Sequence, residues 1–272
     1  MLQLDCERTP MNANFPDAVV VTGAGRGIGR ALALACAKAG SAVLCLSKTG
    51  SCHETSKAIL TQGGRASSLQ VDLADASAAH QMVTDWIWQQ GAVNLGVVAA
   101  AAILGPEGAF STLQLPAWEE TLRVNLLGNL AVVHAALPFM LRARYGRIVT
   151  LAGGGSAYAY PIFPAYAASK AALVRVVENL SEDLEGNGNI AVVCLAPGAI
   201  DTDMLAAVQA AGAEVRTKGE LSKVVAFVEA FMTGNGTAIT GRLVHAQDPW
   251  AAMLVGAAAP LSASQWKMRR VE

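Results

Sequence analysis

Residues 18–29 read AVVVTGAGRGIG, a short apolar run that leads into a glycine cluster. A continuously apolar run of this length is typical of a strand that is covered on both faces. Glycines lack a Cβ, so the backbone after the strand can adopt positive φ angles and approach a phosphate closely. Helical spacing follows over residues 28–39. This arrangement predicts a dinucleotide site, with an ordinary glycine-rich turn as the alternative. The residues expected to contact the dinucleotide are Gly23, Gly25, Arg26, Gly27, Ile28 and Gly29.

The rest of the chain alternates short apolar runs with helical patterns. Strands are expected at 43–46, 66–71, 97–101, 147–151, 190–195 and 242–245, and helices at 54–62, 75–90, 115–144 and 163–185. Pro138 should kink or divide the long helix at 115–144. Strands separated by helices of this length indicate a doubly wound parallel sheet of about seven strands with helices on both faces. We expect residues 17–272 to form this single Rossmann-type α/β domain and residues 1–16 to be a flexible tail.

Composition excludes several classes of protein. The 272 residues are 53% hydrophobic and 15% charged, and the formal net charge is −1. Such a chain is too apolar for a disordered protein and has no basic excess for nucleic acid. No run of 18 apolar residues lacks a charge and no signal peptide is evident, so no membrane partner is expected. The five scattered cysteines fit a reduced cytoplasmic protein, and the four scattered histidines predict no metal site.

The adenosine end of the expected dinucleotide site lies after the second and third expected strands, at 43–46 and 66–71. Where a carboxylate would hold the ribose of NAD(H), the sequence has Ser47 and Lys48. A lysine, with Arg26 nearby, suits a 2′-phosphate, so we expect NADP(H), with NAD(H) as the alternative. The alternative interpretation of Lys48 is an ordinary surface lysine with no contact to the cofactor. Asp72, beside Leu73, is expected at the adenine, while Asp75 is the better N-cap of the helix that follows.

Four segments together resemble the short-chain dehydrogenase/reductase family, in its single-domain branch. They are the glycine cluster, Tyr166-Ala-Ala-Ser-Lys170, Arg123-Val-Asn125-Leu and Pro197-Gly198-Ala-Ile-Asp-Thr202. The resemblance covers nearly the whole chain after residue 17. It implies that the last segment holds the nicotinamide amide, through Pro197, Gly198, Ile200 and Thr202. It also implies that Asn125 keeps a water for the proton path and that Lys170 holds the nicotinamide ribose.

Tyr166 and Lys170 lie four residues apart, so they share one face of a helix. An ammonium near the phenol is expected to lower the tyrosine pKa. Such a tyrosine can exchange the proton of a carbonyl/alcohol couple while the cofactor carries the hydride. We therefore expect an oxidoreductase that interconverts a secondary alcohol and a ketone. The alternative is a dinucleotide-binding protein with little or no turnover, acting as a sensor or assembly subunit.

Two departures from the family pattern affect the expected site. Gly153 stands where the family usually has a serine that hydrogen-bonds the substrate oxygen. Ser156, three residues later, or the backbone N–H groups of residues 153–155 are the candidate replacements. Residues 99–102 are all alanine where the family usually has Asn-Asn-Ala-Gly, so Ala99 and Ala100 are expected to hold the cofactor differently or more weakly.

Apolar side chains around these segments suggest a substrate wall and a subunit interface. Tyr158, Tyr160 and Phe163 would form a wall, and Met204, Leu205 and Val208 a lid, for a mainly apolar or cyclic substrate; plain packing is the alternative. A homodimer or homotetramer is expected through the helices at 115–144 and 163–185. The apolar residues assigned to that surface are Val132, Val133, Leu137, Leu173, Val174 and Val177, and Trp250, Met253 and Leu254 are expected to cross to a partner.

Overall fold

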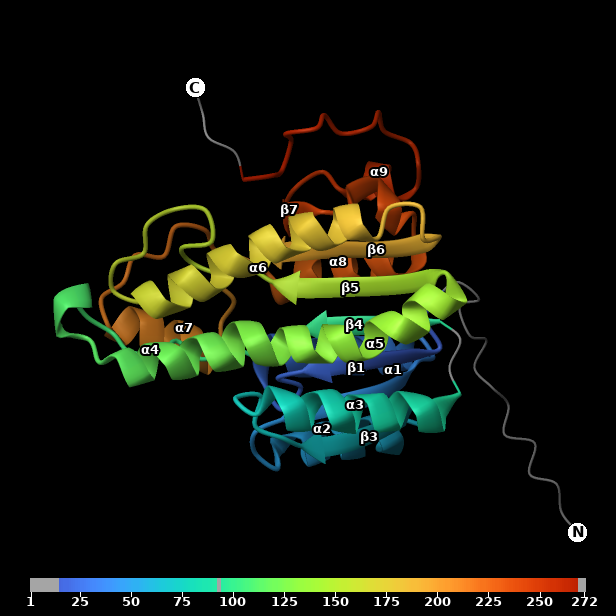
Figure 1. Ribbon diagram of the computed structural model, residues 1–272, viewed down its shortest axis with the longest axis horizontal. Helices are drawn as coiled ribbons and strands as arrows, with labels where there is room; N and C mark the ends of the chain where they lie inside the picture. Colours follow the sequence, from blue (N-terminus) through green and yellow to red (C-terminus); the bar gives the residue numbers. More distant parts are fainter. Residues whose placement is uncertain (1–14, 92–93, 269–272) are drawn as a thin grey trace, which may run out of the picture.

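The computed structural model describes residues 15–91 and 94–268, so most of the expected N-terminal tail lies outside the described residues. Seven parallel strands form one sheet in the order β3-β2-β1-β4-β5-β6-β7, which confirms the predicted fold (Figure 1). The strands are β1 Ala18–Thr22, β2 Ala42–Ser47, β3 Arg65–Gln70, β4 Leu95–Ala99, β5 Tyr145–Leu151, β6 Asn189–Ala196 and β7 Arg242–His245. The strand order reverses beside β1, and ligands of such sheets bind where it does, beyond the carboxyl ends of the strands.

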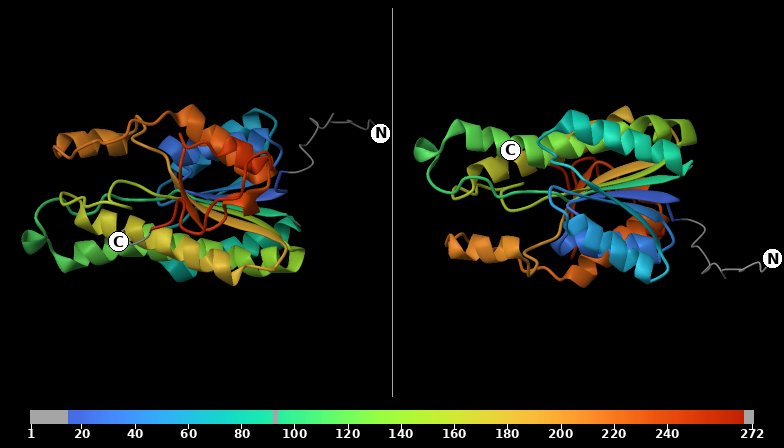
Figure 2. Two further views of the ribbon diagram at one scale, coloured as in Figure 1. Left: turned by 90° about the horizontal axis from the view of Figure 1, so that it is seen from above. Right: turned by 90° about the horizontal axis from the view of Figure 1, so that it is seen from below.

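Helices cover both faces of the sheet. The helices are α1 Gly27–Lys38, α2 Ser51–Thr61, α3 Ala76–Gln90, α4 Leu115–Leu122, α5 Asn129–Ala143, α6 Pro164–Asp183, α7 Asp203–Ala210, α8 Leu221–Thr233 and α9 Ala251–Leu254. Seen from above, α1 and α8 lie on one side of the sheet and α5 and α6 on the other (Figure 2). α4 and α7 extend past the arrowheads of the strands, where the expected site residues gather (Figure 1).

The predicted long helix is interrupted, but not at the proline. α5 continues through Pro138, and the change of geometry lies at a π-helical segment, Arg123–Gly128, between α4 and α5. The combined helix Leu115–Ala143 is long and apolar enough to cross a membrane by length and composition alone. It instead packs on α3, β4 and β5, with Val132, Ala136 and Met140 fully buried. We therefore interpret it as a core helix.

The apolar residues assigned to a subunit interface belong mostly to the core of this chain. Val132, Val133, Leu173, Val174 and Val177 are buried against the sheet, and Leu137 is partly buried beside them. The C-terminal residues also fold back on their own chain: the Trp250 ring meets Phe227 edge-on at 5.1 Å, and Leu254 is buried. In this structure the segment lies on its own chain, and its expected crossing to a partner stays a prediction. The apolar faces of α5 and α6 turn toward the sheet.

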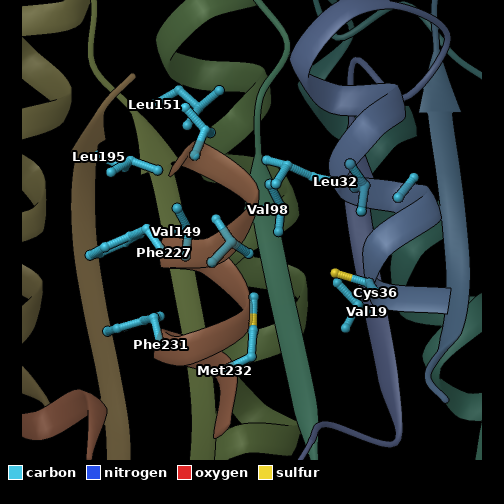
Figure 3. Packing of buried hydrophobic residues seen from close by; sticks show 14 of the residues in the cluster. Val19, Leu32, Cys36, Val98, Val149, Leu151, Leu195, Phe227, Phe231 and Met232 are labelled. Carbon is cyan, nitrogen blue, oxygen red and sulfur yellow. The ribbon is translucent and has the colours of Figure 1, made fainter. Parts of the chain in front are cut away.

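The core on the α8 side shows how the sheet and helices hold each other. Phe227 and Phe231 stack with ring centroids 6.0 Å apart, and Met232 follows them along the same helix. They face Val149 and Leu195 of the central strands (Figure 3). Burying each large side chain contributes about 1.5–3 kcal/mol, so this layer fixes the strands whose carboxyl ends carry the site.

Candidate active site

The glycine turn between β1 and α1 has the geometry of an anion cradle. Gly23 and Gly27 have φ angles of +65° and +53°, which side-chain-bearing residues rarely adopt. A Cβ on Gly29 would lie 2.3 Å from the carbonyl oxygen of Gly23, so only glycine fits this approach. The N-cap residue Arg26 makes no side-chain hydrogen bond to the free N–H groups of α1. The N-terminus of α1, starting Gly27-Ile28-Gly29, is thus open to the diphosphate of a dinucleotide.

Both cations expected at the 2′-phosphate are engaged in ion pairs. Lys48 Nζ lies 2.8 Å from Asp72 Oδ2 and 3.9 Å from Glu120 Oε1, and the hydrogen bond to Asp72 raises the pKa of Lys48. Arg26 pairs with Asp203 at 2.8 Å across the site. Exposed pairs of this kind contribute about 0–1 kcal/mol, so a phosphate can displace the carboxylates. Asp72 is therefore a partner of Lys48 here, in addition to its expected place near the adenine.

Hydroxyl groups complete the adenosine end. Ser47 ends β2, and its Oγ accepts a hydrogen bond from the N–H of Cys52. The hydroxyls of Thr49 and Ser51 lie 2.9 Å apart, and a Cβ on Gly25 would touch Ser51 Oγ. Asp75 caps α3 by accepting from the N–H of Ala78 at 2.9 Å, as predicted. These residues fit an NADP-type adenosine better than an NAD-type one, because no carboxylate ends β2.

The segment of four alanines is held by two residues that the sequence did not single out. Thr22 Oγ1 donates to Asn129 Oδ1 at 2.7 Å and accepts from the N–H of Ala101 at 3.0 Å. Asn129 Nδ2 donates to the carbonyl of Ala101 at 2.9 Å. The buried Ala99 and half-buried Ala100 are thus positioned through backbone contacts of their neighbour. The available signal was an asparagine one turn after Asn125 in an otherwise apolar helical pattern.

Asn125 lies in the π-helical segment and is fully buried. Its Oδ1 accepts from the N–H of Ile103, and its Nδ2 donates to the carbonyl of Ile103, each at 2.8 Å. Its Nδ2 also donates to Ser169 Oγ at 3.0 Å. Both amide protons of Asn125 therefore go to the protein. In this structure it ties the loop after β4 to α6, next to Lys170, and its expected role in keeping a water stays a prediction.

The Tyr166 and Lys170 side chains are both buried at the start of α6. Lys170 Nζ lies 5.6 Å from the centre of the Tyr166 ring and donates to the carbonyl of Leu151 at 2.8 Å. Burial lowers the pKa of Lys170 to about 8, and burial also raises the pKa of Tyr166 well above its usual range. The expected lowering of the tyrosine pKa is not found, because the ammonium faces Leu151 and desolvation dominates.

The glycine at position 153 is required by the position of Tyr166. A Cβ on Gly153 would lie 2.2 Å from Tyr166 Oη, so the phenol occupies the place of a side chain. Ser156 does not face that place: its Oγ accepts from the N–H of Gly153 at 2.9 Å and donates to the Gly153 carbonyl at 2.7 Å. Its hydroxyl proton is therefore used within the turn, and Ser156 does not act in this structure as the expected donor to substrate.

Part of the predicted wall and lid comes together around Tyr166, but Tyr158 is exposed beneath the Arg216 guanidinium and Leu205 lies outside the cluster. Phe163, Tyr166 and Val208 are buried in one cluster, with Met204 and Tyr160 packed against it. Met204 Sδ lies 4.0 Å from Tyr166 Oη and covers the phenol. The cluster has the apolar character expected of a substrate wall, and α7 is folded onto it.

The loop before α7 brings the remaining expected cofactor residues beside the glycine turn. Gly198 has a φ of +73°, and a Cβ there would lie 2.9 Å from Gly219 Cα. Ile200 is buried, and Thr202 caps α7 through its Oγ1. A Cβ on Gly27 would lie 3.3 Å from the Thr202 methyl group, so the two loops are adjacent. Pro197 follows β6 directly.

Leu73, which was also expected at the cofactor, packs in the core. Its carbonyl lies against Gly128 of the π-helical segment.

Comparisons with known proteins agree with this geometry. Residues 17–213 match the short chain dehydrogenase family. The chain is 33% identical over 187 residues to a short chain dehydrogenase of Pseudocercospora fijiensis, covering 68% of this chain and 60% of that protein. It thus spans about 60% of the length of that relative. It is 34% identical over 192 residues to a 3-oxoacyl-(acyl-carrier-protein) reductase of Aggregatibacter actinomycetemcomitans, covering 70% and 78% of the two chains.

Solved structures give the same result. A putative NAD(P) dependent gluconate 5-dehydrogenase from Beutenbergia cavernae, with bound NADP at low occupancy, superposes with a TM-score of 0.77 at 31% identity, covering 86% of this chain and 96% of that one. A short chain dehydrogenase from Burkholderia cenocepacia in complex with NADP gives 0.73 at 28% identity, covering 85% and 97%. With the family match spanning residues 17–213, these results show that the chain belongs to the short-chain dehydrogenase family of NAD(P)-dependent oxidoreductases.

Proposed function

We propose that this chain is an NADP(H)-dependent oxidoreductase that interconverts a secondary alcohol and a ketone, with Tyr166 as the acid/base. The observation that carries the proposal is the pairing of Tyr166 and Lys170 on α6, next to the loop before α7 and the glycine turn. Burial keeps Tyr166 protonated at neutral pH, since it raises the phenol pKa. A protonated phenol suits the reductive direction, in which Tyr166 Oη gives its proton to the carbonyl oxygen.

The cofactor assignment rests on the paired cations and hydroxyls at the ends of β2 and β3. Lys48 and Arg26 would exchange Asp72 and Asp203 for the 2′-phosphate. The open N-terminus of α1 would hold the diphosphate, and Lys170 the nicotinamide ribose. The bound cofactor would supply the hydride, while Asn125 keeps α6 and the loop after β4 in place.

The test is oxidation of NADPH against a panel of ketones, including cyclic apolar ones. We expect turnover with at least one ketone, and loss of about 10²–10⁴ in kcat for Tyr166→Phe with NADPH binding retained. Phenylalanine preserves the ring packing against Gly153 but removes the proton. Equal turnover of the parent and Tyr166→Phe would contradict the role of Tyr166.

A second candidate function is dinucleotide binding without turnover, as a sensor or assembly subunit. It is favoured by one observation: Tyr166 is only 7% exposed, with Met204 over its hydroxyl. NADPH binding detected by fluorescence, together with no turnover of any ketone on the panel, would establish this alternative.

We further propose that the protein is a cytoplasmic homodimer or homotetramer. Cys36, Cys45, Cys52 and Cys194 are free and buried, which fits a reducing compartment. Exposed apolar side chains remain near the long helix, at Phe110, Leu115 and Leu127. Their burial against a second copy fits an oligomer, and a monomer in light scattering at micromolar concentration would contradict it.

A further inference from the structure

The turn after β5 holds its backbone in a defined shape around Tyr166. The N–H of Ser156 donates to the carbonyl of Gly153 at 3.1 Å, which closes a β-turn with Gly154 and Gly155 at its centre. Gly155 has a φ of +85°, the value required at the third position of a type II turn. The Ser156 hydroxyl also accepts a hydrogen bond from the N–H of Gly153 and donates one to the Gly153 carbonyl.

Two N–H groups of this turn are left without an acceptor in the described part of the chain, those of Gly154 and Gly155. Gly155 is buried against α6, where a Cβ would lie 2.4 Å from the Ala167 methyl group, so this residue is less accessible to a substrate than Gly154. Gly154 is only half-buried. Its nitrogen is two covalent bonds from Gly153 Cα, and a Cβ on that atom would lie 2.2 Å from Tyr166 Oη.

We propose that the N–H of Gly154 donates the hydrogen bond to the substrate's carbonyl oxygen that position 153, having no side chain, does not supply. Ser156 is then a positioning residue that fixes this N–H through the turn. The carbonyl oxygen would lie between Tyr166 Oη and the Gly154 nitrogen, and it would take its proton from Tyr166 alone. This inference rests on the proposed ketone reduction.

A matched pair of substitutions isolates the N–H group. Proline is favoured at the second position of a type II turn, so Gly154→Pro removes the N–H while keeping the turn. Gly154→Ala keeps the N–H and adds a similar Cβ, which would lie 3.1 Å from the Tyr160 ring in both variants. We expect kcat for ketone reduction to fall about 10²-fold in Gly154→Pro relative to Gly154→Ala, with unchanged NADPH binding. Equal kcat values in the two variants would overturn the proposal.

The positioning role of Ser156 predicts a non-additive result. Ser156→Ala should lower kcat through the loosened turn and leave the KM for NADPH unchanged. Adding it to Gly154→Pro should cause no further loss, because the group that Ser156 positions is already gone. A full additional loss in the double variant would show that Ser156 acts on the substrate independently, and would overturn this assignment.

A spectroscopic readout decides the question without turnover. Protein labelled with ¹⁵N-glycine is saturated with NADP⁺ and titrated with cyclohexanone, a pair that holds no hydride to transfer. The Gly154 resonance is identified by its loss in Gly154→Ala. We expect its amide proton to move downfield as the ketone binds. A resonance that stays fixed at saturating ketone overturns the proposal, whereas absent turnover with a shifting resonance would overturn only the proposed reaction.

Discussion

The contact between Gly153 and Tyr166 makes position 153 sensitive to any side chain. Restoring the serine usual in the family, Gly153→Ser, should reduce kcat about 10²-fold instead of raising it, because Tyr166 Oη must leave its place. Gly153→Ala should show a similar loss, since the Cβ alone causes the conflict. Steady-state ketone reduction measures both. A gain in kcat for Gly153→Ser would mean that the phenol has a second productive position.

The buried Lys170 should make the free energy of unfolding depend on pH. Burial lowers its pKa from 10.5 to about 8, so between these values the unfolded chain binds more protons than the folded protein. Stability attributable to this group therefore rises with pH across that window and is lowest below about pH 8. Lys170→Met should stabilise the cofactor-free protein by about 3 kcal/mol at pH 7, with the gain vanishing near pH 10.5.

Urea unfolding at pH 7, 8.5 and 10 checks this expectation for Lys170. Lys57→Met, at an exposed position of α2, is the matched control. A stability gain in Lys170→Met that is constant across the three pH values would contradict the buried-charge explanation.

Among the elements, the junction of β1, β4 and α5 depends on Asn129. Its fully buried side chain joins Thr22 to Ala101, where the family's usual asparagines are absent. Asn129→Ala would leave the Thr22 hydroxyl and the Ala101 carbonyl without this partner, so we expect a loss of about 2–4 kcal/mol in the free energy of unfolding. Urea titration measures it, with Asn187→Ala as the control, because the half-buried Asn187 side chain donates only to carbonyls of its own turn. A loss below 0.5 kcal/mol, on the order of a surface change, would contradict this role.

The elements also show how far sequence patterns reach. The central strands were predictable because they are buried on both faces and so are continuously apolar, as in residues 18–22, whereas β3 is only partly buried and includes two serines. The π-helical segment was not, since one extra residue in a turn barely alters an apolar helical pattern. The pairing of Lys48 with Asp72 and the contact of Tyr166 with Gly153 depend on distances between separate strand ends and helices. Sequence placed these residues in one site but could not give their partners.

At the scale of the whole molecule, the two ends of the sheet carry different kinds of residues. The carboxyl ends carry the glycine turn, Tyr166 and the loop before α7. Near the opposite end, the buried Arg147 donates to carbonyls of Phe231, Asn189 and Gly234. These bonds fix α8 to β5 and β6 without an acidic partner among them. The reactive end thus carries exposed ion pairs, whereas the other end is joined by buried hydrogen bonds.

The outer edge of β7 is covered by the C-terminal segment 261–268. The N–H of Leu243 donates to the carbonyl of Trp266 at 2.8 Å, as a neighbouring strand would allow. Arg242 donates to the carbonyl of Gln265 at 2.7 Å. The N–H of Met268 donates to Glu178 Oε1 at 2.9 Å. An uncovered edge strand pairs readily with other chains, so this segment limits association through β7.

Deleting residues 261–272 should therefore change both stability and association. Loss of the packed Trp266 and Leu261 should lower the free energy of unfolding by about 2 kcal/mol. Exposure of the Leu243 N–H should raise the mass in light scattering above that of the parent, with growth at higher concentration. Deletion of residues 269–272 alone keeps every contact described above and should match the parent. If the longer deletion keeps the mass of the parent, the edge of β7 is protected by its own shortness, and the C-terminal segment contributes packing alone.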